Sequence, residues 1–299
     1  MSAALALLWA GVALGAAPAD SFRTAQVGEV RVVAAERELD RAVGLAELAD
    51  RPAEWPGLGR VAPGPFRLVL VRDSAALDRV THGRAPGWGA GVAFPGARTI
   101  ILRADLPDLQ ATLRHEVAHL VLRARLRSRV PLWFDEGYAA LAAGEWGRLA
   151  EWQIHLGVAF GGVPTLGDLD GQLRASAFQA DRAYALAAGA VSALAARIPG
   201  GDLRPLLDRL AAGEDFDGAV RRTTGRSVPR FESEWREATR REYRGALWLV
   251  AGGWWLLGAI VVVVAWGLRR RRERPRRAAL DVGWEMPQNE PIDPGGEGV

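Results

Sequence analysis

The pattern of apolar residues changes at Pro131, and this change restricts the possible folds more than any other feature of the chain. Before it, Val27–Ala35 and Phe66–Arg72 alternate or run apolar with β-branched residues, as strands do, and Arg37–Asp50 reads as a helix between them. After Pro131 almost every segment has a helical period. Strands followed by helices predict an α+β fold, in which a cleft separates a small β-containing lobe from a mainly helical lobe.

Glycine and proline separate the expected elements. Pro52–Pro65 is a connector rich in both residues, and Gly161–Pro164 and Pro199–Gly201 interrupt the helical part. The helices expected after Pro131 are Trp133–Ala143, Glu145–Phe160, Ala175–Ile198, Leu203–Ala212, Phe216–Arg222 and Pro229–Tyr243.

Composition excludes some classes of function. The chain has 299 residues and a net charge of +3, with 38 basic residues that are all arginine and no cysteine. Seven of the arginines and six of the 35 acids follow Leu268, so the rest of the chain is nearly neutral and gives no case for a nucleic-acid partner. Without cysteine, stability must come from a hydrophobic core, and a thiolate-rich structural zinc site is excluded.

The pentapeptide His115-Glu116-Val117-Ala118-His119 is the clearest chemical motif. On a helix, residues four apart lie on the same face, so both imidazoles can reach one metal ion. Glu116 then leans over the open side of the metal, where it is placed to take a proton from a zinc-bound water. The alternative is an ordinary helix on which the two histidines are surface residues.

The surrounding sequence favours a helix around this motif. Apolar residues recur with a helical period across Leu106–Leu126, Pro107 suits a first turn, and Asp105 or Asp108 is placed to cap the start. Arginines crowd the far end, where the helix dipole is negative. The motif should therefore lie in the middle of a helix, where its geometry suits a metal.

A third ligand is expected from the next helix. A catalytic zinc site holds three protein ligands and keeps one position for water, and in this chain the third ligand must be His, Asp or Glu. Pro131–Ala139 looks like the start of a second helix, and a helix hairpin would return Glu136 to the metal. For the neighbouring Asp135 we expect a solvated helix acid, with an N-cap role as the alternative.

The two motifs together carry a family resemblance. HExxH followed after a short turn by a W-x-x-E-G-x-A helix resembles the gluzincin metallopeptidases, most closely the peptidase-MA-like proteins and more distantly thermolysin and the aminopeptidase N group. The resemblance implies that His115, His119 and Glu136 bind one Zn²⁺ per chain and that Glu116 is the general base. Thermolysin has an aspartate four residues after its glutamate ligand to orient a histidine, but this chain has Ala140 there. The residue that fixes the histidine tautomer is therefore not identified.

The resemblance extends to the segment before the motif. Gly91–Leu102 reads as a hairpin or a bent edge strand. In gluzincins such an edge lies over the cleft and pairs with extended substrate through main-chain hydrogen bonds. The resemblance therefore implies a substrate-binding role for Gly91, Val92, Ala93 and Phe94. An ordinary strand is the alternative.

Hydrolysis of a peptide bond develops negative charge on the carbonyl oxygen, which needs a hydrogen-bond donor. The wider family uses a Tyr or His from a later helix, and Tyr184 stands in the segment of this chain that resembles it. We expect Tyr184 to stabilise the oxyanion, with Tyr138 and then His155 as alternatives. A core tyrosine with a satisfied hydroxyl is the competing explanation for both tyrosines.

The sequences at both ends of the chain predict that the protein is attached to a membrane. Ala3–Ala17 is small and apolar, and the A-x-A-like Ala17–Ala19 predicts a signal peptide at 1–19, or else an uncleaved anchor. Ala246–Leu268 is uncharged and long enough to cross a bilayer, and the arginine run after it marks the cytoplasmic side. We therefore expect an extracytoplasmic domain (20–245), a single C-terminal transmembrane helix (246–268) and a basic, then disordered, cytoplasmic tail (269–299).

These features predict a membrane-anchored zinc metallopeptidase that acts on peptides or proteins in the periplasm or outside the cell. The alternative is a catalytically inactive, zinc-containing membrane protein that binds peptides or partners, although the retained Glu116 favours the enzyme. An intramembrane protease also uses HExxH, but Arg114, Arg123 and Arg125 make this helix a poor membrane span. The natural substrate, endo- or exopeptidase action and the oligomeric state are left open.

Overall fold

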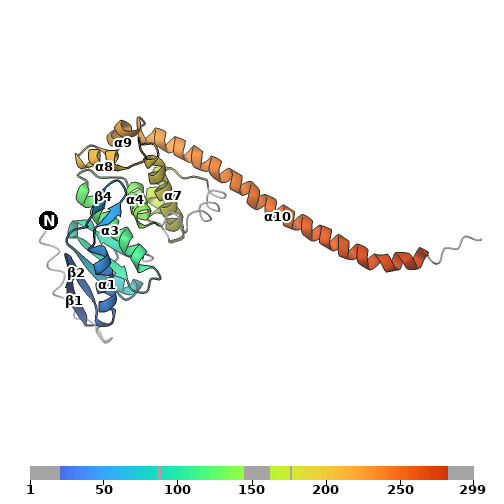
Figure 1. Ribbon diagram of the computed structural model, residues 1–299, viewed down its shortest axis with the longest axis horizontal. Coiled ribbons are helices and arrows are strands. Elements are labelled where there is room, and N and C mark those ends of the chain that lie inside the picture. Colours follow the sequence, from blue (N-terminus) through green and yellow to red (C-terminus); the bar gives the residue numbers. More distant parts are fainter. Residues whose placement is uncertain (1–20, 86–88, 145–161, 176, 282–299) are drawn as a thin grey trace, which may run out of the picture. The chain divides into compact units, whose positions relative to one another are not determined.

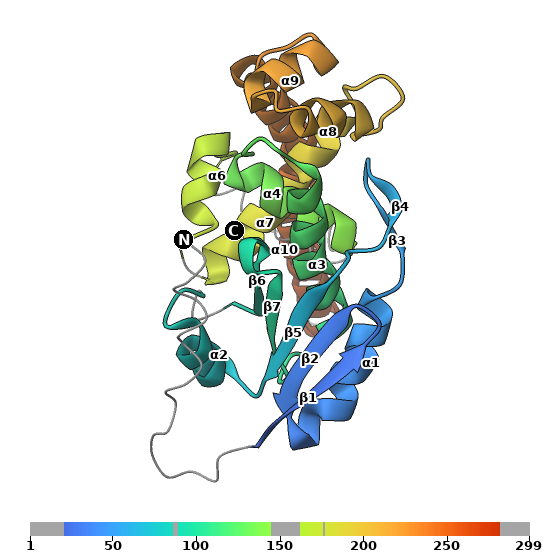
Figure 2. The same ribbon diagram turned by 90° about the vertical axis from the view of Figure 1, so that its left-hand side faces the viewer.

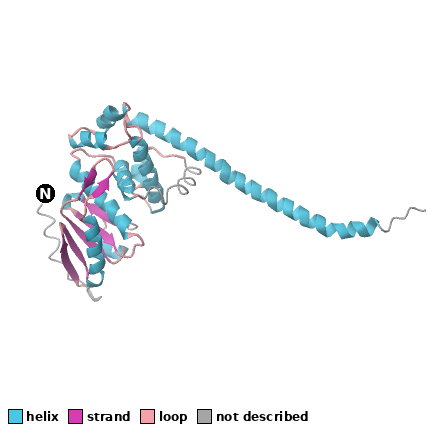
Figure 3. Ribbon diagram, viewed as in Figure 1, coloured by secondary structure: helices cyan, strands magenta, loops and turns pink. Residues whose placement is uncertain are grey.

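The computed structural model describes residues 21–85, 89–144, 162–175 and 177–281, which fall into two compact units, Met1–Tyr243 and Arg244–Val299. The expected signal peptide at 1–19, the helix expected at Glu145–Phe160 and the end of the tail lie outside the described residues. The strands belong to the first part of the chain and helices follow them, and Figure 3 shows the two kinds of element in magenta and cyan. The α+β class expected from the sequence is therefore confirmed.

A mixed five-stranded sheet forms the N-terminal part of the first unit, in the order β1-β2-β5-β7-β6. Its central strands β2, β5 and β7 are parallel, whereas β1 pairs antiparallel with β2 and β6 pairs antiparallel with β7. The strands are β1 (Phe22–Val27), β2 (Val30–Ala35), β5 (Phe66–Val71), β6 (Gly91–Phe94) and β7 (Thr99–Arg103). The sheet therefore ends in β6, one of its two edge strands.

Alternating side chains give the sheet two buried faces of unequal size. Residues such as Leu68, Leu70 and Ile100 join the main core, together with helices α1 (Leu39–Ala49) and α3 (Leu109–Arg125). On the opposite face a small cluster that includes Val69 packs against α2 (Ser74–Thr81). Figure 2 shows α1 and α2 on opposite sides of the sheet. The HExxH helix α3 thus lies on the face that carries the main core.

Several N-terminal elements differ from the sequence prediction. The strand expected at Val27–Ala35 begins only at Val30, as β2, because Gly28 takes a positive φ of 52° and turns the chain between β1 and β2. The Pro52–Pro65 connector contains a small two-stranded sheet, and the segment before His82 contains α2, which was not expected. The remaining elements of this region are η2 (Glu36–Glu38), β3 (Ala53–Trp55), β4 (Gly59–Val61) and η3 (Pro95–Ala97).

Helices follow α3, as expected, and all of them lie close to the predicted bounds except α6, which was not expected. They are α4 (Leu132–Ala143), α6 (Leu166–Gln172), α7 (Ala177–Ala195), α8 (Arg204–Ala211) and α9 (Phe216–Thr224). α4 packs against both α3 and α7, as Figures 1 and 2 show. Gly137 permits this approach, because a Cβ atom there would lie 2.4 Å from the carbonyl oxygen of Ala187.

The expected transmembrane helix is wrong. α10 (Val228–Asp281) is one helix of 54 residues, whose chain continues from the first unit into the second. Among the described residues, no helix has an apolar stretch long enough to cross a membrane. This finding contradicts the membrane span expected at Ala246–Leu268.

Candidate metal centre

Helix α3 carries the HExxH motif in its middle, as the sequence predicts. The side chain of Asp108 caps its start by accepting a hydrogen bond from the backbone N–H of Ala111 at 3.0 Å, which selects Asp108 over Asp105 as the cap. Arg123 and Arg125 occupy the last turn, where cations stabilise a helix. His115 and Glu116 are buried, so the motif faces inward rather than into solvent.

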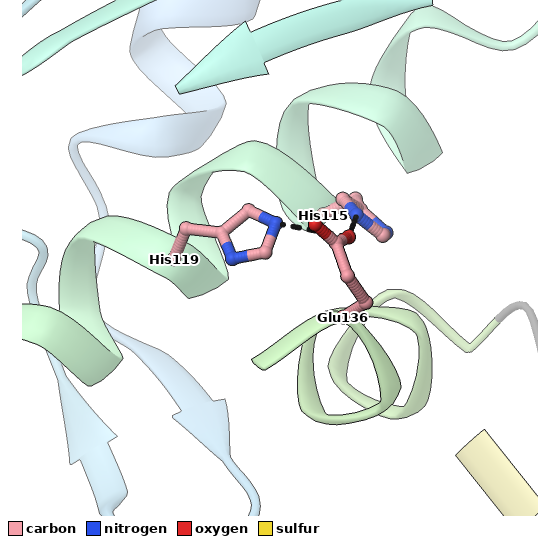
Figure 4. A group of neighbouring side chains, drawn as sticks. All are labelled: His115, His119 and Glu136. Carbon is pink, nitrogen blue, oxygen red and sulfur yellow. Dashed lines mark hydrogen bonds and ion pairs between the residues drawn. The ribbon is translucent and has the colours of Figure 1, made fainter. Parts of the chain in front are cut away.

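His115, His119 and Glu136 converge on one point. Their ligand atoms all lie within 4.8 Å of one another, and the two imidazole rings are 5.1 Å apart. Oε2 of Glu136 lies 3.4 Å from Nε2 of His115 and 3.5 Å from Nε2 of His119. In Figure 4 the carboxylate of Glu136 rises from α4 between the two rings on α3. The predicted helix hairpin therefore forms and brings together the three residues proposed as ligands.

The donor set fits a zinc ion. Two imidazoles and one carboxylate are a ligand set of catalytic zinc sites, which hold three protein ligands and leave a position for water. Both histidines present the same nitrogen, Nε2, to the shared carboxylate oxygen, so the three donors face a common centre. These are the only His, Cys, Asp or Glu side chains in the described part of the chain that form such a group.

Packing at the start of α4 fixes Glu136. Asp170 of α6 accepts a hydrogen bond from the backbone N–H of Trp133 at 2.7 Å, which satisfies a free donor of the first turn. The indole of Trp133 is buried against Phe216 at 5.8 Å and stacks near Phe231 at 6.4 Å. Residues of α6, α9 and α10 therefore hold the first turn of α4, which directly precedes Glu136.

Asp135 differs from the sequence prediction. It is only 8% exposed, and its two carboxylate oxygens accept hydrogen bonds from different residues. Oδ1 lies 3.0 Å from Nδ1 of His119, and Oδ2 lies 2.7 Å from Nη2 of Arg123. The solvated acid expected here, and the alternative N-cap, are therefore both wrong. One sequence signal could have indicated this contact. Arg123 lies one turn beyond His119 and has no acid nearby on its own helix, so it needs an acidic partner from another element.

Glu116 lies beneath the edge strand β6. Its carboxylate accepts a hydrogen bond from the backbone N–H of Ala93, and its Cγ is 3.4 Å from the place where a Cβ of Gly91 would stand. Burial raises the pKa of Glu116 above its usual value, and the nearby charges of His115 and His119 oppose this rise. The expected base and the expected edge strand are thus in direct contact.

The electrostatics of the cluster favour a cation. Burial by itself would raise the pKa of Glu136, but the positive charge of His119 and a hydrogen bond with His115 hold it well below its usual value. Burial lowers the pKa of His119, but Glu136 and then Asp135 outweigh this effect and hold it well above its usual value. Two carboxylates therefore create a negative potential around His119, which a bound metal cation would also experience.

Of the other residues expected at the site, Tyr184 lies at the cluster and Tyr138 does not. The ring of Tyr184 lies 5.8 Å from the ring of His115 in an edge-to-face arrangement, so α7 brings Tyr184 to the cluster. Tyr138 is fully buried in the core instead, and burial raises the pKa of its hydroxyl. His155 lies outside the described residues. Ala140, at the position of the thermolysin aspartate, is buried in α4 and has no polar side chain to offer.

Two hollows in the first unit lie away from the cluster. They have volumes of about 530 and 450 Å³ and border the β3–β4 hairpin. Arg204 of α8 lines both, and Arg114 of α3 lines the smaller one, but none of the three clustered residues lines either. Both hollows therefore border α3 without opening onto the three clustered residues.

No family model matches this chain, and no curated protein matches it significantly. The gluzincin resemblance accordingly stays a prediction from the sequence motifs.

Proposed function

We propose that this chain is a zinc-dependent metallopeptidase. The observation that carries the proposal is the convergence of His115, His119 and Glu136 from two helices, with Glu116 on the same helix as the histidines. A structural zinc site usually has four protein ligands, whereas the described part of the chain brings three together. An open position of this kind suits catalysis.

Each clustered side chain has a defined role in the proposed reaction. A zinc ion held by the two imidazoles and Glu136 would supply Lewis-acid chemistry, since it polarises the scissile carbonyl and makes water more acidic. Glu116 accepts a proton from the attacking water on its carboxylate and passes that proton to the leaving amine nitrogen. Its raised pKa suits this exchange, because a base with a pKa nearer to neutrality also acts as an acid.

The register of the edge strand supports substrate binding by β6. Arg103 donates its N–H to the carbonyl of Ala90, so Ala90, Val92 and Phe94 face β7 in the antiparallel ladder. The backbone groups of Gly91 and Ala93 consequently point to the open edge. The N–H of Ala93 donates a hydrogen bond to Glu116. An extended peptide would therefore pair with three other groups, the N–H and carbonyl of Gly91 and the carbonyl of Ala93.

Tyr184 is the proposed donor to the oxyanion. Its ring lies beside His115, and the hydroxyl of a tyrosine at this distance can reach a carbonyl oxygen held at the centre. It would act with the metal and without forming a covalent bond to the substrate.

The proposal is tested by digestion of a broad peptide library with the zinc-loaded full chain. Glu116→Gln keeps the shape of the side chain but removes the base, so hydrolysis should fall about 10²–10⁴-fold while zinc remains bound. Glu47→Gln is the matched control, because Glu47 is exposed on α1. If the Glu116→Gln variant cleaves peptides as fast as the wild type, the proposed mechanism is wrong. If the zinc-loaded wild type cleaves nothing, a peptide-binding protein becomes the better description.

A further inference from the structure

His119 is contacted on both of its ring nitrogens by consecutive residues of α4. Nε2 faces Oε2 of Glu136 at 3.5 Å, and Nδ1 faces Oδ1 of Asp135 at 3.0 Å. Consecutive residues of a helix diverge by about 100° around its axis, so their carboxylates approach the ring from two sides. α4 therefore contacts the imidazole at both ends.

Arg123 completes this arrangement from α3. It stands one turn beyond His119, as His119 stands one turn beyond His115, so the three side chains lie on one face of the helix. Its guanidinium reaches the second oxygen of Asp135, with Nη2 at 2.7 Å from Oδ2. The two oxygens of Asp135 are thus divided between a histidine of the cluster and an arginine next to it.

This arrangement decides which ring nitrogen of His119 is available to a metal. An ionised carboxylate only accepts hydrogen bonds, so Nδ1 of His119 carries a hydrogen that it donates to Asp135, and Nε2 is the nitrogen whose lone pair a metal ion would receive. The side chain of Asp135 is only 11% exposed, so losing one partner would leave it poorly satisfied. Arg123 therefore neutralises a buried charge and holds the carboxylate in position.

We propose that Asp135 and Arg123 form a positioning pair that fixes the tautomer and orientation of His119 and thereby strengthens metal binding. This inference rests on the zinc site of the proposed function and assigns to Asp135 the role that Ala140 cannot fill. Carboxylates that orient a metal-bound histidine are worth about 10–100-fold in metal affinity. Neither residue of the pair is proposed to contact substrate.

The test is the zinc affinity of the full chain, measured by competition with a chromophoric chelator. Asp135→Ala should weaken zinc binding about 10–100-fold. Asp135→Asn should weaken it less, because an amide oxygen still accepts the hydrogen bond from Nδ1 but carries no charge. Arg123→Gln should also weaken it less, because Asp135 is then present but less firmly held.

The matched control is Asp208→Asn. Asp208 of α8 forms an ion pair at 2.9 Å with Arg125, which lies on α3 as Arg123 does. Both side chains are 55% exposed, and neither belongs to the cluster. Its zinc affinity should equal that of the wild type. Thermal unfolding of each variant without metal separates a positioning role from loss of the fold, since the metal-free melting temperature should change little in Arg123→Gln.

Cobalt gives a second readout that a structural role would not move. In the Co²⁺-loaded chain the visible absorption bands report the ligand geometry, and they should shift in Asp135→Ala but not in Asp208→Asn. If Asp135→Ala and Arg123→Gln keep wild-type zinc affinity and an unchanged cobalt spectrum, the positioning pair is refuted while the zinc site stands. If the wild type itself binds no zinc, the proposed function fails instead.

Discussion

Tyr184 and Tyr138 differ in their surroundings, and the difference predicts opposite consequences for loss of the hydroxyl. Tyr184 lies edge-to-face with His115 at the cluster. The hydroxyl of Tyr138 is buried and has no hydrogen-bond partner in the described part of the chain. A buried hydroxyl without a partner destabilises a fold, whereas one beside the reacting carbonyl would stabilise the transition state.

Tyr184→Phe should lower kcat/KM for peptide hydrolysis by roughly 10²–10³-fold, because one donor to the oxyanion is lost. Tyr138→Phe should leave kcat/KM unchanged and should leave the free energy of unfolding equal or slightly higher. Steady-state kinetics and urea unfolding of both variants measure this contrast. Equal activity losses in the two variants would contradict the role assigned to Tyr184.

At the scale of elements, the site depends on how closely α4 approaches its two neighbours. α3 supplies two of the clustered side chains and α4 supplies the third, and α7 packs against the other side of α4. Gly137 follows Glu136 directly and has no room for a methyl group next to the backbone of α7. Any displacement of α4 would therefore also move Glu136.

Gly137→Ala should lower the free energy of unfolding by about 1–3 kcal/mol, because the new methyl group overlaps the carbonyl of Ala187. It should also weaken zinc binding, since α4 must shift. Gly44→Ala is the control in the middle of α1, where a Cβ meets nothing within 4 Å, and it should raise stability by about 0.5–1 kcal/mol. Urea unfolding measures both changes. A Gly137→Ala variant as stable as the wild type would contradict the close packing of α4 on α7.

The elements that the sequence predicts well are those with a strong apolar period. β2, β5, α1 and α3 were expected near their observed positions, and so were α4, α7, α8 and α9. β1 was missed because most of its side chains are exposed, and α2 because it buries only Leu77 and Thr81. Such elements form through contacts with the sheet and leave little pattern in the sequence.

The site follows the same rule. His115, His119 and Glu136 belong to motifs whose spacing carries their chemistry, so the sequence alone was enough to propose them. The partner of His119 was not predictable in this way, because the contact with Asp135 depends on how far apart α3 and α4 pack. Burial of Asp135 by neighbouring helices is likewise a tertiary effect, which the local sequence does not reveal.

At the scale of the whole molecule, one core connects the sheet to the site. The main buried cluster runs from the strands through α3, α4 and α7 to Phe216 of α9 and Phe231 of α10. The clustered ligands lie within this packed unit, and none of its packing needs a metal. The first unit should therefore fold without zinc and gain stability when zinc binds.

Removal of zinc by a chelator should lower the melting temperature without unfolding the chain at room temperature. Free zinc at about 100 times its dissociation constant stabilises the native state by roughly 2.7 kcal/mol, which is several degrees for a domain of this size. Differential scanning fluorimetry with and without chelator measures the shift, and His115→Ala serves as the control that should show none. Complete unfolding on chelation would contradict a core that forms without metal.

The most direct test of the three-ligand zinc site is elemental analysis of the purified full chain. The wild type should contain one zinc ion per chain. His115→Ala, His119→Ala and Glu136→Ala should each lose most of it, whereas Glu47→Ala on the surface of α1 and Glu116→Gln should retain it. Full zinc occupancy in Glu136→Ala, or absence of zinc from the wild type after reconstitution, would contradict the site.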